Sequence, residues 1–166
     1  MAEIFDIVDE NDRVIGRATR EECHSNPDLM HRSICILIFN SKGDLLLQKR
    51  SMKKDLNPGK WTTSVSGHVK SGNNYEEAAK RELEEELGIS LPMEKLFVVD
   101  LRLKQESEMS MVFRAKSNGP FKPDPEEVDE VRFFSIEEIK RMLQEKSGML
   151  TPCCRIVLKG YFKRFP

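Results

Sequence analysis

The sequence lacks the features that would place it at a membrane or outside the cell. It has no apolar run near twenty residues and no secretory signal, and its four cysteines (Cys23, Cys35, Cys153 and Cys154) form neither a regular framework nor a CxxC metal pattern. It also lacks an excess of charge of one sign, since the net charge is −1 and the pI is near 6.3. We therefore expect a cytoplasmic, reduced protein that has neither a nucleic-acid polymer nor a membrane as a partner.

What is present is typical of one globular domain with a single core, because 39% of the 166 residues are apolar and 33% are charged. Hydrophobic patterns and turn residues predict strands around one central helix, with further helices at the end, which indicates an α/β fold with a mixed sheet. The predicted order is a strand and turn up to 12, a strand at 14–16, a helical turn at 17–23, a hairpin of 33–40 and 44–50, a strand at 61–66, a helix at about 74–88, strands at 95–104, 108–116 and 131–135, a helix at 135–144 and a helix from 152. The run 33–40 is rich in β-branched residues and is expected to be buried on both faces.

The central helix carries the most informative group of charges. Glu82, Glu85 and Glu86 fall within an arc of roughly 100° that borders an apolar stripe, so we expect them to line a wall beside the core. Glu82 and Glu86 have no basic residue three or four positions away, and their mutual repulsion calls for a cation. Mg²⁺ and Mn²⁺ prefer carboxylate oxygen, so the pattern indicates metal-assisted phosphate chemistry, with an ordinary solvated acidic helix as the alternative.

The segment from Gly67 to Ile89 resembles the Nudix box: a glycine, five residues, a glutamate, seven residues, then Arg-Glu-apolar-any-Glu-Glu-any-Gly-apolar. The matching residues are Gly67, Arg81, Glu82, Leu83, Glu85, Glu86, Gly88 and Ile89. Asn73 departs from the pattern, because the family has a glutamate there that orients the loop and pairs with the arginine. Either Asn73 or Asn74 can cap the helix, and Gly88 suits its left-handed C-terminal position.

This resemblance implies a Nudix-type α/β/α sandwich with a mixed central sheet. We expect a single domain over 1–166, with a core at about 30–145, an N-terminal strand and turn extension at 1–29 and a C-terminal helix at 150–166. The resemblance also implies that Glu82, Glu85 and Glu86, with the backbone carbonyl of Ser66, hold Mg²⁺ or Mn²⁺ beside Arg81.

The chain also resembles the type I isopentenyl-diphosphate isomerases, a branch of the Nudix superfamily, in the run from His24 to His68 and in the segment ESEM at 106–109. In those enzymes three histidines and two glutamates hold a divalent metal, and the matching residues here are His24, His31, His68, Glu106 and Glu108. An imidazole-rich site suits Mn²⁺ or Zn²⁺ better than Mg²⁺. The resemblance therefore implies a second divalent metal at the histidines.

Two departures from the isomerases bear on the reaction. Their catalytic cysteine is Ser66 here, and a hydroxyl cannot replace a thiol of pKa about 8.5 in proton transfer to an alkene carbon. The isomerases generally keep a degenerate box, whereas this chain keeps the Arg81-Glu82 and Glu85-Glu86 pairs. We therefore favour a metal-dependent hydrolase of a nucleoside diphosphate-linked or other organic diphosphate. The alternatives are an isopentenyl-diphosphate delta-isomerase and a catalytically silent phosphate-binding module.

In the hydrolase hypothesis, Glu82 is the first choice to position or deprotonate the attacking water, and Glu108 is the second. Arg50 and Lys54 match phosphate-contacting positions of the isomerases and are the candidate substrate ligands. Trp61 could pack on a nucleobase or prenyl tail, although an aromatic residue at the end of a strand is more often part of a core. The loop at 119–127 is expected to select the leaving group, and a homodimer is one option for the assembly.

Overall fold

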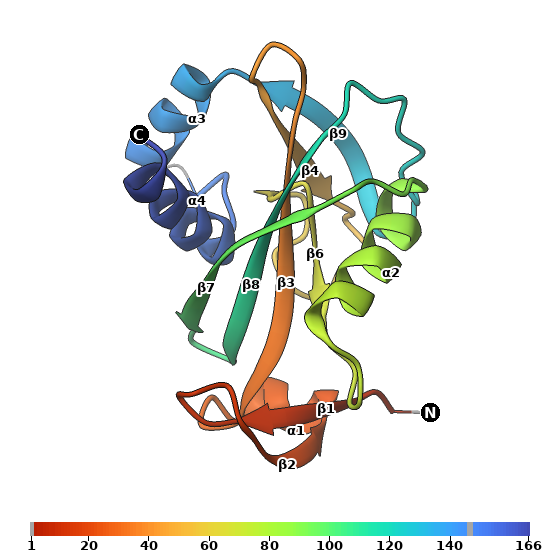
Figure 1. Cartoon of the computed structure of the whole chain (residues 1–166), viewed down its shortest axis with the longest axis vertical. Coiled ribbons are helices and arrows are strands. Elements are labelled where there is room, and N and C mark those ends of the chain that lie inside the picture. Colours follow the sequence, from red (N-terminus) through yellow and green to blue (C-terminus); the bar gives the residue numbers. More distant parts are fainter. Residues whose placement is uncertain (1, 146–147) are drawn as a thin grey trace.

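The computed structural model describes residues 2–145 and 148–166 of the chain. Its strands are β1 (Ile4–Val8), β2 (Val14–Thr19), β3 (Met30–Phe39), β4 (Leu45–Arg50), β5 (Trp61–Thr62), β6 (Val65–His68), β7 (Glu94–Arg102), β8 (Ser107–Lys116) and β9 (Val128–Phe134). Its helices are α1 (Arg20–Ser25), α2 (Tyr75–Leu87), α3 (Ile136–Gln144) and α4 (Pro152–Arg164). The strands form one mixed sheet, with α2 on one side and α3 and α4 on the other (Figure 1), which confirms the predicted α/β/α sandwich.

Strand β3 lies inside the sheet and contributes to the cores on both of its faces. Ile34, Ile36 and Ile38 belong to the core that includes α2, while Cys35 and Leu37 belong to the core that includes α4. All five side chains are at most 1% exposed. The alternation follows from the strand period of two, which sends successive side chains to opposite faces. The prediction that this run is buried on both faces is confirmed.

The prediction that 33–40 and 44–50 form a hairpin is correct next to the turn but wrong for the rest of the two strands. β3 and β4 share one register pair, Phe39 with Leu45, and then separate, so that β4 pairs with β9 while β3 pairs with β6 and with the parallel strand β8. Ser64 bridges the gap, because its hydroxyl donates to the Leu46 carbonyl and accepts from the Ile38 amide. The predicted strand 61–66 is accordingly two strands, β5 and β6, with Ser64 between them.

The N-terminal extension also differs from the prediction. β2 continues to Thr19, because its residues stay paired with β1, and α1 spans Arg20–Ser25 instead of 17–23. Thr19 sets the start of α1, since its hydroxyl accepts from the Glu22 amide and the Glu22 carboxylate accepts from the Thr19 amide. This capping box places His24 in the last turn of α1.

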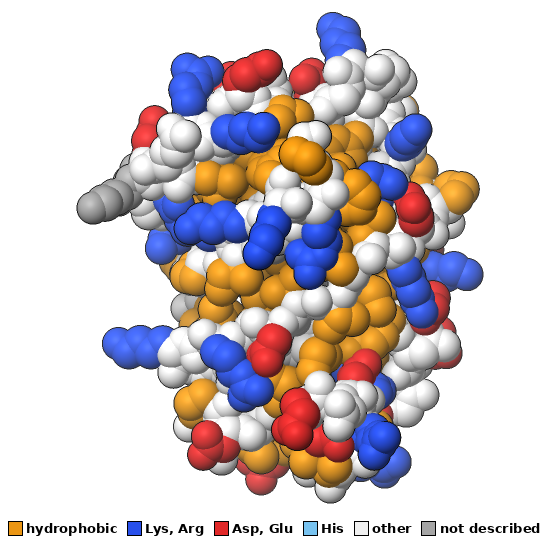
Figure 2. Space-filling view, turned by 60° about the vertical axis from the view of Figure 1, so that its left-hand side comes forward, with side chains coloured by type: hydrophobic (Ala, Val, Ile, Leu, Met, Phe, Trp, Pro, Cys, Tyr) orange, Lys and Arg blue, Asp and Glu red, His pale blue; other side chains and the backbone are white. Residues whose placement is uncertain are grey.

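The face formed by α3 and α4 is mixed in character. Figure 2 shows hydrophobic side chains separated by lysines and arginines over this face. Arg164 lies over the Phe97 ring at 4.1 Å, and Arg114 lies over the Phe165 ring at 5.0 Å, so part of the apolar surface is covered by guanidinium groups. Among the helices that the structure describes, none has the length and apolarity needed to cross a bilayer.

Candidate active site and metal centre

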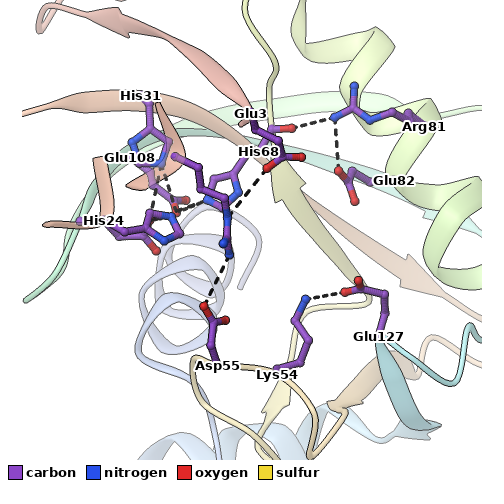
Figure 3. Close-up of polar contacts among 12 residues, drawn as sticks. Glu3, His24, His31, Lys54, Asp55, His68, Arg81, Glu82, Glu108 and Glu127 are labelled. Atoms are coloured by element: carbon purple, nitrogen blue, oxygen red, sulfur yellow. Dashed lines mark hydrogen bonds and ion pairs between the residues drawn. The ribbon is translucent and has the colours of Figure 1, made fainter. Parts of the chain in front are cut away.

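One open cleft of about 1230 Å³ brings the two predicted groups of site residues together. The predicted residues that line it are His24, Arg50, Lys54, His68, Glu82, Glu85, Glu86, Glu106 and Glu108. In Figure 3 the histidines lie on one side of this space, Arg81 and Glu82 lie on the other, and Lys54 and Glu127 lie below.

The histidine centre is built from four segments that come from three separate parts of the chain. His24 lies in the last turn of α1, His31 near the start of β3 and His68 at the end of β6, while Glu106 directly precedes β8. Their Nε2 atoms lie 2.7 Å (His24), 3.5 Å (His31) and 3.7 Å (His68) from Oε2 of Glu106. One ligand atom from each of the four residues lies within 4.8 Å of the others. The parallel register of β3 and β8, which sets His31 opposite Glu108, holds the fifth predicted ligand at the edge of this group.

The donor atoms of this centre fit a divalent cation. Within the described part of the chain, His24 Nε2, His31 Nε2 and Glu106 Oε2 are buried and have no hydrogen-bond partner. The short approach of His24 to Glu106 lacks hydrogen-bond geometry, so it does not satisfy either atom. Unpartnered buried polar atoms are destabilising, and three imidazoles with a carboxylate are a donor set that suits Mn²⁺ or Zn²⁺.

Protonation and packing hold the imidazoles in place. Burial would lower the pKa of His68, but the neighbouring carboxylates of Glu106 and Glu108, 3.7 and 3.4 Å from its Nε2, outweigh burial and raise it to about 10. Burial also opposes ionisation of Glu106, yet the contacts with His31 and His68 lower its pKa. Phe5, fully buried on β1, lies against both rings, with centroids 5.1 Å from His31 and 4.9 Å from His68. The N-terminal extension therefore supplies one ligand, His24, and also supplies Phe5, which packs against the other two imidazoles.

The box helix α2 begins and ends as predicted. Asn74 is the N-cap, and its side-chain oxygen accepts from the Glu77 amide at 2.8 Å. Asn73 donates to the Glu77 carboxylate at 2.6 Å. Gly88 ends the helix in the left-handed region, at φ 66°. Asn73 therefore ties the loop to the first turn of the helix, although it lacks the carboxylate of the family pattern.

Two of the three box glutamates are held largely away from solvent. Glu86 is 8% exposed and accepts from Gln48 Nε2 at 2.7 Å and from the Ser66 amide at 3.4 Å. Burial, reinforced by the Glu82 carboxylate, raises the pKa of Glu86 to about 8. Burial likewise raises the pKa of Glu82. Glu82 lies against Gly67, where an added methyl group would come 2.2 Å from the Glu82 carboxyl carbon, so a larger residue at this position would displace the Glu82 side chain.

Glu85 differs from the other two, because its side chain is 57% exposed. The prediction that all three carboxylates line a wall beside the core is therefore wrong for Glu85, which lies at the end of the arc farthest from the apolar stripe and reaches only the rim of the cleft. Arg81 donates to the His68 carbonyl at 2.8 Å and lies 3.3 Å from Glu82. In the chain as described, the histidine centre is the one group of three or more donors within 4.8 Å, so the box glutamates do not converge on a preformed site.

Of the predicted substrate ligands, Arg50 ends β4 and Lys54 lies in the loop that follows, which contacts the opposite side of the cleft. Lys54 Nζ donates to the Glu127 carboxylate at 2.5 Å, and the Arg50 Nε donates to the Leu56 carbonyl at 2.9 Å. The Ser51 amide also donates to the Glu127 carbonyl. Glu127 therefore neutralises Lys54 and fastens the loop at 51–60 to the loop at 120–127.

Arg20 and Glu127 line the cleft, yet the sequence alone does not single them out. Arg20 is held loosely between Glu3 and Asp55, whose carboxylate oxygens lie 3.8 and 3.9 Å from its guanidinium nitrogens. Neither residue carries a local signal, because Arg20 begins an ordinary helical turn and Glu127 ends an acidic loop. Trp61, in contrast, is 6% exposed and belongs to the core, which confirms the structural interpretation of this aromatic residue.

The sandwich fold, the glycine loop and the acidic helix beside a histidine centre define a Nudix-type domain. In agreement, residues 29–152 match the NUDIX domain family, and the chain belongs to that family.

Comparisons with individual proteins point to two branches of the family. The chain is 39% identical over 148 residues to an uncharacterized Nudix hydrolase of Yersinia pestis, in an alignment that covers 86% of this chain and 79% of the relative. It is 30% identical over 194 residues to isopentenyl-diphosphate delta-isomerase 2 of Homo sapiens, with coverage of 99% and 85%. The crystal structure of DR0079 from Deinococcus radiodurans has a TM-score of 0.76 and 28% identity, over 86% of this chain and 89% of that one. Both resemblances seen in the sequence are confirmed.

Proposed function

We propose that the protein is a metal-dependent hydrolase that cleaves the phosphoanhydride bond of an organic diphosphate. The observation that carries this proposal is the pair of largely buried carboxylates Glu82 and Glu86, which face the same cleft as the basic residues Arg50 and Lys54. Neighbouring carboxylates held away from water are destabilising unless a cation joins them, and Mg²⁺ usually bridges such carboxylates and substrate phosphates. Membership of the NUDIX family supports the same reaction class.

The two groups of donors would hold two ions. Glu82, Glu86 and the Ser66 carbonyl would hold Mg²⁺ or Mn²⁺ at the box, with Glu85 joining from the rim. The four residues of the histidine centre, with Glu108 beside them, would hold Mn²⁺ or Zn²⁺. When bound, the ions would lower the pKa of water and offset the charge that develops on phosphoryl oxygens.

The basic residues would position the substrate by exchanging their present partners. Lys54 would leave Glu127 for a substrate phosphate, and Arg50 would offer a bidentate contact. Arg20, held only at 3.8 and 3.9 Å, would turn to the same anion. Glu82 would orient or deprotonate the attacking water, and Glu108 is the second candidate for this role.

An isopentenyl-diphosphate delta-isomerase is the second candidate function. The compact histidine centre and the similarity to the human isomerase over 99% of the chain favour it. Ser66 speaks against it, because a hydroxyl stands where that reaction would use a thiol. A silent phosphate-binding module is the third candidate, suggested by Asn73 in place of the box glutamate.

A substrate screen distinguishes the three functions. Nucleoside di- and triphosphates, dinucleotides, coenzyme A and isoprenoid diphosphates would be incubated with Mg²⁺ and Mn²⁺ separately. We expect metal-dependent release of phosphate, pyrophosphate or a monophosphate, reduced about 100-fold or more in Glu86→Gln. The matched control Glu84→Gln changes an exposed residue of the same helix and should leave the rate unchanged. Entry of solvent deuterium into dimethylallyl diphosphate without phosphate release would establish the isomerase instead, and binding without turnover would establish the silent module.

A further inference from the structure

Two cysteine thiols meet in the same cleft. Cys35 lies on β3 and Cys153 in the first turn of α4, 118 positions apart in sequence, and their Sγ atoms are 3.9 Å apart. Both residues line the cleft, where Cys153 is partly exposed and Cys35 is 1% exposed. The Cys35 Sγ also lies 3.6 Å from the Ser110 hydroxyl. The fold thus brings two reduced thiols from distant elements into contact at a place that small molecules can reach.

The backbone on either side of Cys153 holds it beside Cys35. The Thr151 amide donates to the Trp61 carbonyl at 2.9 Å, and the Cys154 amide donates to the Thr151 hydroxyl at 3.1 Å, so the start of α4 is fastened to β5. An S–S bond is about 2.05 Å long, so the two sulfurs must approach by about 2 Å to form one.

The other two cysteines provide an internal contrast. Cys23 and Cys154 are fully buried, and burial raises the pKa of the Cys23 thiol to about 11 and raises that of Cys154 as well. A fully buried thiol is out of reach of a dissolved oxidant, so these two cysteines are expected to be inert. Cys153, in contrast, is partly exposed in the cleft, and its Sγ lies against that of Cys35.

We propose that Cys35 and Cys153 are a redox-active dithiol, and that a low-molecular-weight disulfide such as glutathione disulfide oxidises them to a bridge between β3 and α4. The Cys153 thiolate attacks the oxidant, which forms a mixed disulfide and releases one thiolate of the oxidant. The Cys35 thiolate then attacks Cys153 Sγ and releases the second. Two protein thiols are oxidised, the oxidant is reduced to two small thiols, and the two protons of the protein thiols pass to them.

The bridge would act on the neighbouring carboxylates. Cys35 lies opposite Ser66 in the register of β3 and β6, and the Ser66 amide donates to Glu86. A covalent link that draws β3 toward α4 would shift this part of the cleft, and a displacement of about 1 Å near reacting groups lowers rates by as much as about 100-fold. We therefore expect the oxidised protein to hydrolyse substrate at least several-fold more slowly. This effect on turnover rests on the proposed function, whereas the bridge itself does not.

The test uses the full chain in glutathione buffers of increasing oxidised fraction. Peptide mass spectrometry would measure the cross-link between Cys35 and Cys153, and hydrolysis would be measured on the same samples. We expect a cross-linked peptide pair that lacks two hydrogens, with slowed hydrolysis that dithiothreitol restores. Cys153→Ser, at a partly exposed position, should remove both the cross-link and the sensitivity. Cys154→Ala, at the adjacent position, should retain both.

Two results would overturn the proposal. One is the absence of the cross-link in the folded protein under buffers that oxidise the same cysteines after denaturation. The other, which overturns the effect on turnover, is a complete cross-link that leaves hydrolysis at the rate of the reduced protein. A cross-link in a protein that hydrolyses no diphosphate would support the dithiol and contradict the proposed function, so the two failures are distinguishable.

Discussion

At the scale of single residues, Glu86 destabilises the metal-free fold, because its carboxylate is buried in the cleft beside Glu82. Burial and the adjacent Glu82 raise its pKa to about 8, compared with an ordinary value of 4.5. Between these two pH values the folded state retains a proton that the unfolded state has released. The free energy of unfolding of the metal-free protein therefore falls as pH rises from about 4.5 to about 8, and the loss is complete above that range.

Glu86→Gln should remove this pH dependence, because the amide oxygen can still accept from Gln48 and Ser66 but carries no charge. In the presence of a chelator at pH 9, we expect the variant to be more stable than the natural protein, on the order of 2–4 kcal/mol. Below pH 4 the two proteins should be nearly equally stable. Denaturant unfolding over a pH series measures the difference, and a difference that does not vary with pH would contradict the assignment.

Gly67 is the second residue whose identity is explained by one contact. The methyl group of Gly67→Ala would come 2.2 Å from the Glu82 carboxyl carbon. Because the Glu82 side chain can rotate away, we expect the fold to persist while hydrolysis falls about tenfold or more. Melting temperature and kcat are measured together. Gly16→Ala is the matched control, since nothing lies within 4 Å of its added methyl group, and it should leave kcat unchanged.

At the scale of elements, the capping box of α1 positions a metal ligand. Thr19→Ala would remove the hydroxyl that accepts from the Glu22 amide, which is worth about 1 kcal/mol, and would loosen the turn that carries His24. We expect weaker Mn²⁺ binding by titration calorimetry, by several-fold. Ser135→Ala breaks the equivalent capping box of α3, which bears no metal ligand. If the two variants lost Mn²⁺ affinity equally, α1 would have no specific part in the metal centre.

At the scale of the whole molecule, the histidine centre joins the N-terminal extension to the sheet. Its ligands come from α1, β3, β6 and the segment before β8, so a bound cation would cross-link elements that are otherwise held by packing and strand pairing. Ligands that bind only the folded state stabilise it by mass action, by about 2.7 kcal/mol at a concentration of 100 times Kd.

We therefore expect Mn²⁺ to raise the melting temperature and to slow hydrogen exchange in β1 and α1. The variant His24→Ala should lose most of the increase, because it removes the ligand that α1 contributes. Glu84→Gln, at an exposed position of α2 that has no role in either site, should retain it. Equal melting-temperature shifts in His24→Ala and the natural protein would show that the ion binds elsewhere.

Much of the fold could be predicted because its signals are local. The cap at Asn74, the left-handed Gly88 and the apolar stripe of α2 depend on residues within about four positions of one another, and all three are present. The start of α1 depends on an equally local signal, the Thr19–Glu22 capping box, which places the helix at Arg20 and not at the predicted 17. The hairpin prediction failed for a different reason, because strand partners depend on distant hydrogen bonds such as those of Ser64.

By itself, the sequence determined the register of the box, the faces of α2 and the family, since spacing along one helix already sets which side chains share a face. The tertiary structure decided which groups meet: the three imidazoles around Glu106, Glu127 on Lys54, and Cys35 beside Cys153. Those contacts join residues up to 118 positions apart. These contacts arise from strand register and from helix packing. Both depend on residues that are far apart in the sequence, so the residues next to a given position do not determine its contacts.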